Sequence, residues 1–127
     1  MNSKITTILA VLAGAMLGAA GMQALHAQAK PAVYTVAEIT VTNQDAYTKD
    51  YLPVVQALNK KNGAKLLAAS FKVTSLTGTP PARVAINIWD SMEQLQATRS
   101  SDDFKKARAI GEKSATFREY AVEALPK

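Results

Sequence analysis

"RVAINIWDSMEQLQ", residues 83–96, joins the clearest strand pattern in the chain to a helix start. Its first half carries β-branched residues in alternation, which is typical of a strand. Ser91 followed by Gln94 fits a capping box, in which side chains satisfy free backbone N–H groups at a helix N-terminus. Asp90 with Glu93 fits the same pattern. We interpret these carboxylates as parts of a helix cap rather than as catalytic groups.

The remaining elements follow from the same two periodicities, two for strands and 3.6 for helices. In chain order we expect a strand over 31–41, a helix from 42–45 to 62–63, strands over 65–76 and 83–89, a helical region over 91–111 and a strand over 116–125. The order β-α-β-β-α-β is the split βαβ, or ferredoxin-like, arrangement. The fold class is therefore α+β, with both helices on one face of a four-stranded antiparallel sheet.

Two irregularities are expected in the helices. Pro53 cannot donate a hydrogen bond to the carbonyl of Lys49, so a kink or tightened turn should lie near residues 49–53. The second helical region should break near "TRSSDD", residues 98–103, where Ser100 or Ser101 can cap a new helical piece.

The N-terminal segment does not belong to this domain. A short basic start, Met1–Lys4, precedes an uncharged apolar stretch and then Ala27-Gln28-Ala29, a small-residue cleavage pattern. We predict a signal peptide over 1–29, cleaved after Ala29, and therefore a periplasmic or secreted domain over 30–127.

A retained membrane anchor is the alternative. The apolar stretch approaches the ~20 residues that span a bilayer. Gly14 and Gly18 also have the small-residue spacing that packs transmembrane helices together. We favour cleavage, because the Ala-x-Ala pattern stands where a signal peptidase requires it.

Composition excludes several classes of site. The chain has no Cys, and its one His, His26, lies in the predicted signal peptide. The remaining domain of 98 residues, with a net charge of about +4, therefore lacks the usual zinc, haem-His, Ser-His and Cys-His constellations. We expect no metal and no cofactor. Export, and the lack of a phosphate loop or RNA-binding signature, argue against nucleic acid as a partner.

The alternation also predicts which side chains face away from the helices. Val84, Ile86 and Ile88 should face them, because they are the apolar set of their strand. The open face would then carry a mixed set: Tyr34, Val36, Glu38, Arg83, Ala85, Asn87 and Trp89. Leaving such a face in water forgoes roughly 25 cal/mol per Å² of apolar surface, so we predict a homodimer in which a second copy covers it.

Five of these side chains would line one cavity, with a carboxylate, a cation, an amide and aromatic walls. The predicted ligand-binding residues are Tyr34, Glu38, Arg83, Asn87 and Trp89. Glu38 and Arg83 are the candidate catalytic residues if the protein is an enzyme, although a structural Glu–Arg pair is the competing interpretation. Tyr47 and Tyr51, four residues apart, are interpreted as buried structural rings.

Three stretches with Gly63 carry a resemblance to a known family: "YTVAEITVTNQDAYTKDYLP", "LTGTPPARVAINIWDSMEQLQ" and "SSDDFKKARAIGEKSATFREYAVE". Together they resemble the uncharacterised DUF1330 family, in particular its exported members. The resemblance implies a dimeric α/β barrel of ferredoxin-like subunits, a fold shared by small monooxygenases, isomerases and haem-handling proteins. An aromatic pair usual in that family is Thr98-Arg99 here, and a glycine pair is Gly63-Ala64, so a pocket that relied on those aromatics would be altered.

Two functional hypotheses follow. The first is a small organic molecule bound in the cleft between sheet and helices of an exported homodimer. The second is a non-catalytic cell-envelope interaction or stress factor whose barrel is filled by side chains. A filled dimer interface with Glu38 paired to Arg83 would exclude the first, and an open cavity with an unpaired carboxylate would favour it.

Overall fold

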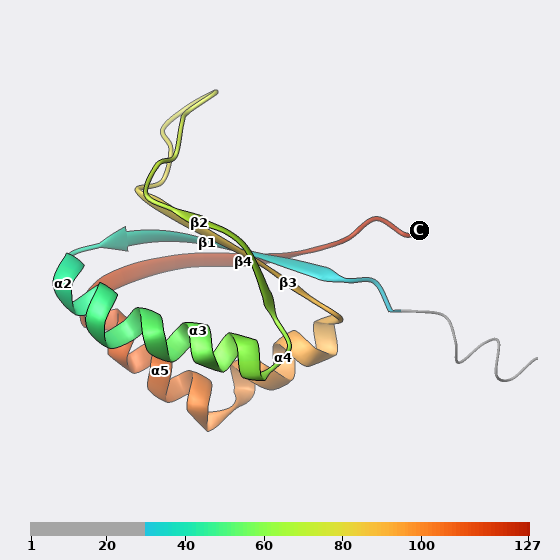
Figure 1. The fold of residues 1–127 in the computed structure, drawn as a ribbon. Helices are drawn as coiled ribbons and strands as arrows, with labels where there is room; N and C mark the ends of the chain where they lie inside the picture. Colours follow the sequence, from blue (N-terminus) through green and yellow to red (C-terminus); the bar gives the residue numbers. More distant parts are fainter. Residues whose placement is uncertain (1–29) are drawn as a thin grey trace, which may run out of the picture. The chain divides into compact units, whose positions relative to one another are not determined.

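The computed structural model describes residues 30–127, and the predicted signal peptide, 1–29, lies outside them. In chain order the elements are β1 (Val33–Val41), α2 (Gln44–Ala46), η1 (Tyr47–Tyr51), α3 (Leu52–Lys61), β2 (Lys65–Ser70), β3 (Arg83–Trp89), α4 (Met92–Ser100), α5 (Asp102–Glu112) and β4 (Ala115–Glu123). The strands form one antiparallel sheet in the order β2-β3-β1-β4. Figure 1 shows the helices on one side of this sheet. The predicted α+β, ferredoxin-like fold is confirmed.

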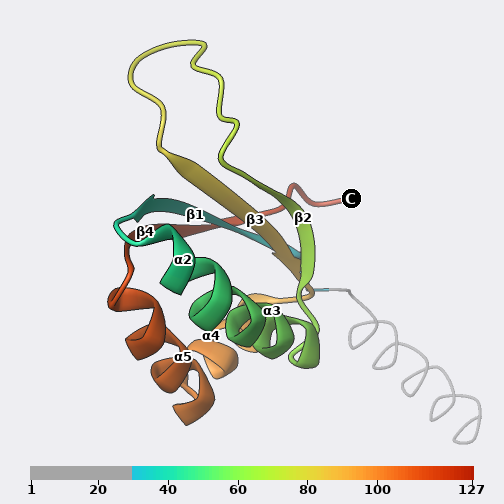
Figure 2. The same ribbon diagram turned by 60° about the vertical axis from the view of Figure 1, so that its left-hand side comes forward.

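Strand β2 is shorter than the sequence pattern predicted. It ends at Ser70 rather than at residue 76, and a loop then runs to the start of β3. This loop projects beyond the sheet (Figures 1 and 2), and Leu76 on it is 96% exposed. Pro80 and Pro81 cannot donate to a strand ladder, which explains why pairing resumes only at Arg83.

An irregular turn does lie near Pro53, but it is a wider, π-helical turn over Tyr47–Tyr51 rather than the kink or tightened turn expected over residues 49–53. After α2, which Asn43 caps by accepting a hydrogen bond from the N–H of Ala46 at 3.1 Å, the chain widens into η1. The N–H of Leu52 bonds to the carbonyl of Tyr47, five residues back. Pro53 then lies in the first turn of α3, where its missing N–H costs least.

The helix caps are those that the sequence predicted. Ser91 begins α4 by accepting from the N–H of Gln94 at 3.2 Å, and Ser101 caps α5 in the same way. The Gln94 side chain accepts from the N–H of Asp90 at 2.9 Å and donates to the carbonyl of Asn62 at 2.8 Å. Gln94 therefore fixes the start of α4 against the end of α3.

The strand register corrects the predicted faces of β3. β1 and β3 pair with Val33 opposite Trp89 and Ile39 opposite Arg83, and paired residues share a face. Val33, Ile39, Arg83 and Trp89 are all buried. The face of the sheet towards the helices, the covered face, therefore carries Arg83, Ala85, Asn87 and Trp89, and the prediction that these four lie on the open face is wrong.

The open face is correspondingly apolar on β3, where Val84, Ile86 and Ile88 are half-buried. The prediction for β1 is confirmed, since Tyr34, Val36 and Glu38 pair with these three residues and share their face. The open face is thus more apolar than the sequence analysis expected.

Two clusters make the core beneath the sheet. One joins Val33, Ala64, Trp89 and Leu95, and the other joins Ile39, Tyr47, Tyr51 and Ala115. Gly111 allows α5 to approach closely, because a Cβ there would lie 2.7 Å from the Tyr51 ring. Within residues 30–127, none of the helices has the length and apolar character needed to cross a bilayer.

Candidate functional site

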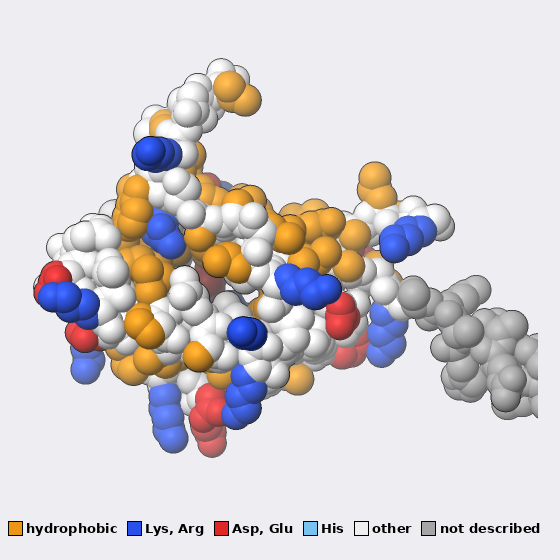
Figure 3. Space-filling model, viewed as in Figure 1, with side chains coloured by type: hydrophobic (Ala, Val, Ile, Leu, Met, Phe, Trp, Pro, Cys, Tyr) orange, Lys and Arg blue, Asp and Glu red, His pale blue; other side chains and the backbone are white. Residues whose placement is uncertain are grey.

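A cavity of about 470 Å³ lies between the covered face and helix α3. In the view of Figure 3 it appears as a hollow between β2 and α3, with apolar side chains around it. Its walls are largely apolar: Ala37, Ile39, Leu52, Val55, Ala64, Leu66, Ala69, Ala85 and Phe117. A few polar groups also line it, among them Tyr47, Arg83, Asn87 and Glu119. This combination is characteristic of sites for small organic molecules.

Arg83 supplies the buried cation of the cavity. The residue is 7% exposed, and its Nε donates to the Tyr47 hydroxyl at 3.2 Å. The guanidinium also lies 4.6 Å from the centre of the Phe71 ring and 5.6 Å from that of Tyr47. Two aromatic rings thus hold the cation in place, and each gains electrostatic attraction from it.

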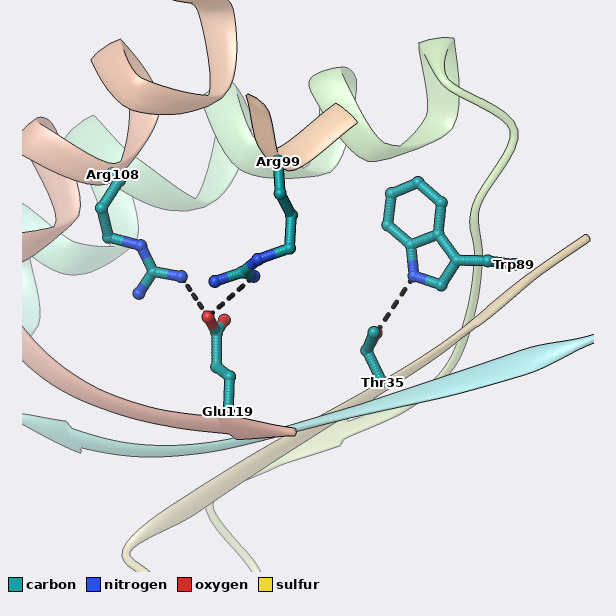
Figure 4. A network of polar contacts seen from close by, with 5 residues as sticks. All are labelled: Thr35, Trp89, Arg99, Arg108 and Glu119. Atoms are coloured by element: carbon teal, nitrogen blue, oxygen red, sulfur yellow. Dashed lines mark hydrogen bonds and ion pairs between the residues drawn. The ribbon is translucent and has the colours of Figure 1, made fainter. Parts of the chain in front are cut away.

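Glu119 supplies the carboxylate of the cavity, and it comes from β4 (Figure 4). Its Oε2 accepts from Arg99 of α4 at 2.9 Å and from Arg108 of α5. Arg108 also stacks 4.2 Å from the centre of the Phe117 ring. One carboxylate therefore holds both C-terminal helices to the sheet.

A second cavity of about 200 Å³ adjoins the first, and both are lined by Tyr51, Asn59, Asn87 and Glu119. Trp89 lines the second one. It is 3% exposed, and its Nε1 donates to the Thr35 hydroxyl at 3.1 Å (Figure 4). Trp89 is thus part of the core between the sheet and the helices, and it also forms part of the wall of the smaller cavity.

The five predicted ligand-binding residues do not share one cavity, because the register places them on two faces. Arg83 and Asn87 line the larger cavity and Trp89 the smaller one. Tyr34 and Glu38 lie on the open face. The prediction that the five residues line one cavity is therefore wrong. Whether any of them binds a ligand stays a prediction.

The two candidate catalytic residues, Glu38 and Arg83, are likewise separated by the sheet. Glu38 pairs instead with Arg118, its neighbour on β4, at 3.0 Å between Oε2 and Nη1. Their roles in catalysis remain predictions, but a direct Glu38–Arg83 pair does not exist in this structure.

Glu119 was not predicted as a cavity residue, and Tyr47 was predicted to be structural. A signal for Glu119 was present, since Phe117 and Glu119 share one parity of β4 and a large apolar ring belongs on the covered face. Tyr47 gave no such signal. Its place beside Arg83 depends on the π-turn, which residue spacing does not reveal.

Both tyrosines of η1 remain neutral at physiological pH. Burial raises the pKa of the Tyr47 phenol, although the hydrogen bond from Arg83 opposes this. Burial also raises the pKa of Tyr51, with Arg108 opposing. Their hydroxyl groups can therefore donate hydrogen bonds, whereas neither is a ready base. No cluster of three or more His, Cys, Asp or Glu suited to a metal ion occurs in residues 30–127.

Solved structures share the fold at low sequence identity. A protein of unknown function from Rhodopseudomonas palustris matches with a TM-score of 0.64 at 12% identity, over 84% of this chain and 92% of that one. SnoaB, a cofactor-independent oxygenase from Streptomyces nogalater, matches with a TM-score of 0.57 at 12% identity, over 76% and 96%. A putative antibiotic biosynthesis monooxygenase from Caulobacter crescentus matches with a TM-score of 0.52 at 19% identity, over 76% and 92%.

Among curated protein sequences, none matches this chain significantly. One family model does match, over residues 32–125, and it covers all of the strands and helices described above. That model is described as a domain of unknown function, DUF1330. The three stretches that carry the resemblance in the sequence all fall within this range. The chain therefore belongs to the DUF1330 family.

Proposed function

We propose that this protein binds a small, largely apolar organic molecule in the cavity between the covered face and α3. The observation that carries the proposal is the cavity itself, about 470 Å³ with apolar walls and a few converging polar groups. Drug-sized and metabolite-sized ligands occupy pockets of roughly 300 to 1,000 Å³ with such linings. A filled barrel, which the alternative of a purely structural envelope factor requires, is not supported by a cavity of this size.

The proposal includes the setting that the sequence predicts, an exported homodimer. The N-terminal charge and cleavage pattern supports export of the domain over 30–127. The apolar open face supports self-association, because Val84, Ile86 and Ile88 would gain from a second copy packed on them. The dimer would bury the face opposite the cavity and leave the opening between β2 and α3 accessible.

Binding, rather than a particular reaction, is the function that the polar groups support. Glu119 is held by two arginines through one oxygen, and the tyrosines of η1 stay protonated. SnoaB is a cofactor-independent oxygenase, but the likeness to it concerns the fold at 12% identity. Oxygenase activity would therefore need support from a reaction with a bound ligand.

Native mass spectrometry of the protein purified from its own source tests the proposal. We expect the native spectrum to contain a small-molecule adduct that disappears on denaturation. Ala69→Trp would place an indole in the cavity from the exposed edge strand β2, and should reduce the adduct at least ~10-fold.

Ala97→Trp is the matched control. Ala97 is exposed on α4 and lines neither cavity. The variant should therefore carry as much of the small-molecule adduct as the wild type. A wild-type protein without any adduct, which also binds no member of a chemically diverse library, would refute ligand binding.

A further inference from the structure

We propose that the ligand is a hydrophobic carboxylic acid whose carboxylate docks on Arg83 and the Tyr47 hydroxyl. The inference rests on the proposed function and names the ligand class for the same cavity. The basis is the positive charge of Arg83, which is buried without an acidic partner among the described residues.

Arg83 lacks an acidic partner. Its residue is 93% buried, yet within residues 30–127 no carboxylate forms an ion pair with it. Its one hydrogen bond there runs from Nε to the Tyr47 hydroxyl, so its Nη groups have no acceptor among these residues, and Arg83 itself lines the cavity. An unpaired buried charge is costly, and a ligand carboxylate would offset that cost.

Within residues 30–127, the one carboxylate that lines the cavity is already engaged. Glu119 lines it, but Arg99 and Arg108 both bind its Oε2. Lys60 and Lys65 add two further cations to the lining. The cavity therefore has an excess of positive charge, and such a site concentrates anions.

Tyr47 adds a second contact for the same group. Its oxygen accepts from Arg83, so its own O–H proton is left to donate. Burial raises the pKa of this phenol, which keeps the proton in place at neutral pH. A guanidinium edge next to a hydroxyl donor can bind both oxygens of a carboxylate, and charge-assisted bonds of this kind are the stronger ones.

The rest of the cavity defines the body of the ligand. Ile39, Leu52, Val55, Leu66 and Phe117 form apolar walls of the same cavity. If inorganic phosphate or another small hydrophilic anion bound there, these apolar walls would remain in contact with water. An acid with a flat or chain-like hydrocarbon body uses both parts of the site.

Isothermal titration calorimetry on the full-length chain tests the inference with matched probe pairs. The pairs are 2-naphthoate with 2-naphthamide, and decanoate with decanamide, which differ in charge while keeping the hydrocarbon body. We expect the wild type to bind at least one carboxylate ~10-fold or more tightly than its amide, and inorganic phosphate much more weakly.

Variants then test whether Arg83 is responsible for the preference for a carboxylate over its amide. Arg83→Gln should weaken carboxylate binding far more than amide binding and so abolish the preference. Arg83→Lys should restore part of the preference, because Lys keeps the charge but loses the planar fork. Arg118→Gln is the control, since Arg118 is an exposed cation on the opposite face. The comparison of probes in the wild type needs no variant, so it stands even if Arg83→Gln fails to fold.

The outcomes separate the two proposals. Amides that bind as tightly as carboxylates would overturn the carboxylate inference and leave small-molecule binding intact. Phosphate binding as tight as that of the acids would overturn the hydrophobic class. A carboxylate preference that survives in Arg83→Gln would move the anion site elsewhere and overturn its assignment to Arg83. If no member of either pair binds, the carboxylate inference fails, and the native mass spectrum decides the broader proposal by itself.

Discussion

On β3 the two faces of the sheet divide polar and apolar side chains in the opposite way from the usual pattern. The covered face, towards the helices, holds Arg83, Asn87 and Glu119 around a cavity. The open face holds Val84, Ile86 and Ile88 in a row on β3. A sheet usually turns its apolar set inwards and its polar set to water.

This reversal indicates two different uses. Polar groups on an inner face are tolerated when they are hydrogen-bonded or when a ligand completes them, which fits a binding site. Apolar groups on an outer face are economical when another surface covers them, which fits self-association. Substitutions on each face should therefore affect different properties, self-association for the open face and ligand binding or stability for the covered face.

Ile86→Glu should break the homodimer that we propose for the open face. Ile86 lies at the middle of β3 on that face, and an unpaired carboxylate at the centre of an interface is strongly unfavourable. We expect the dimer dissociation constant, measured by sedimentation equilibrium, to rise at least ~100-fold, about 2.7 kcal/mol.

Val54→Glu is the control for this variant, because Val54 is an exposed apolar residue on α3. It should leave the dissociation constant unchanged. A wild-type protein that sediments as a monomer at every concentration would contradict the dimer outright.

Glu119→Gln should destabilise the covered face by about 2 kcal/mol, because Arg108 is largely buried and would lose its partner. Glu38→Gln provides the matched change on the open face. In the Ile86→Glu background, which keeps the open face in water, its partner Arg118 has a side chain that is 80% exposed, so the loss should not exceed about 1 kcal/mol. Free energies of unfolding from urea titrations give both values, and equal losses would mean that the two faces do not differ electrostatically.

The pH dependence of stability should depend on Tyr51. Burial raises the pKa of its phenol in the folded state, whereas the unfolded chain titrates near ~10. Its contribution is therefore fully present below pH ~10 and is lost as the pH rises above that value, because the unfolded chain releases the proton first. Tyr51→Phe should reduce the stability lost between pH ~9 and ~11 by about 1 kcal/mol in urea titrations.

Tyr120→Phe is the control for the alkaline effect, since Tyr120 is exposed on β4. Both variants should be made in the Ile86→Glu background, so that the open face stays exposed to water. An alkaline loss as steep in Tyr51→Phe as in its parent would show that Tyr51 ionises freely.

The sequence predicted the fold because the signals for its elements are local. Ser91 and Ser101 cap their helices as expected, and Pro53 indicated an irregular turn nearby, although the turn is wider rather than tighter than an α-helical one. Each of these signals acts within one or two turns of the backbone, so spacing alone reveals it.

The site was harder to predict because it depends on which face of β3 meets the helices. In "RVAINIW", Val84, Ile86 and Ile88 alternate with a mixed set of residues. The expectation that the more apolar set faces the helices was wrong here, because the mixed set lies on the covered face. Arg83 is accommodated there by Tyr47 and Phe71, and Trp89 by Thr35. These partners are distant from Arg83 and Trp89 in the sequence, so no local sequence pattern predicts them.

The π-turn η1 has a consequence for how this chain tolerates insertions and deletions. A π-turn holds one residue more than an α-helical turn, and that extra residue sets the rotation of Tyr47 relative to α3. Deleting one residue between Tyr47 and Leu52 would restore a regular helix, yet turn the Tyr47 side chain by about 100° away from Arg83. Circular dichroism of such a deletion variant should show retained helix while calorimetry shows a lost carboxylate preference. To keep the cavity functional, selection would have to preserve the number of residues in this turn more than the identity of its exposed residues.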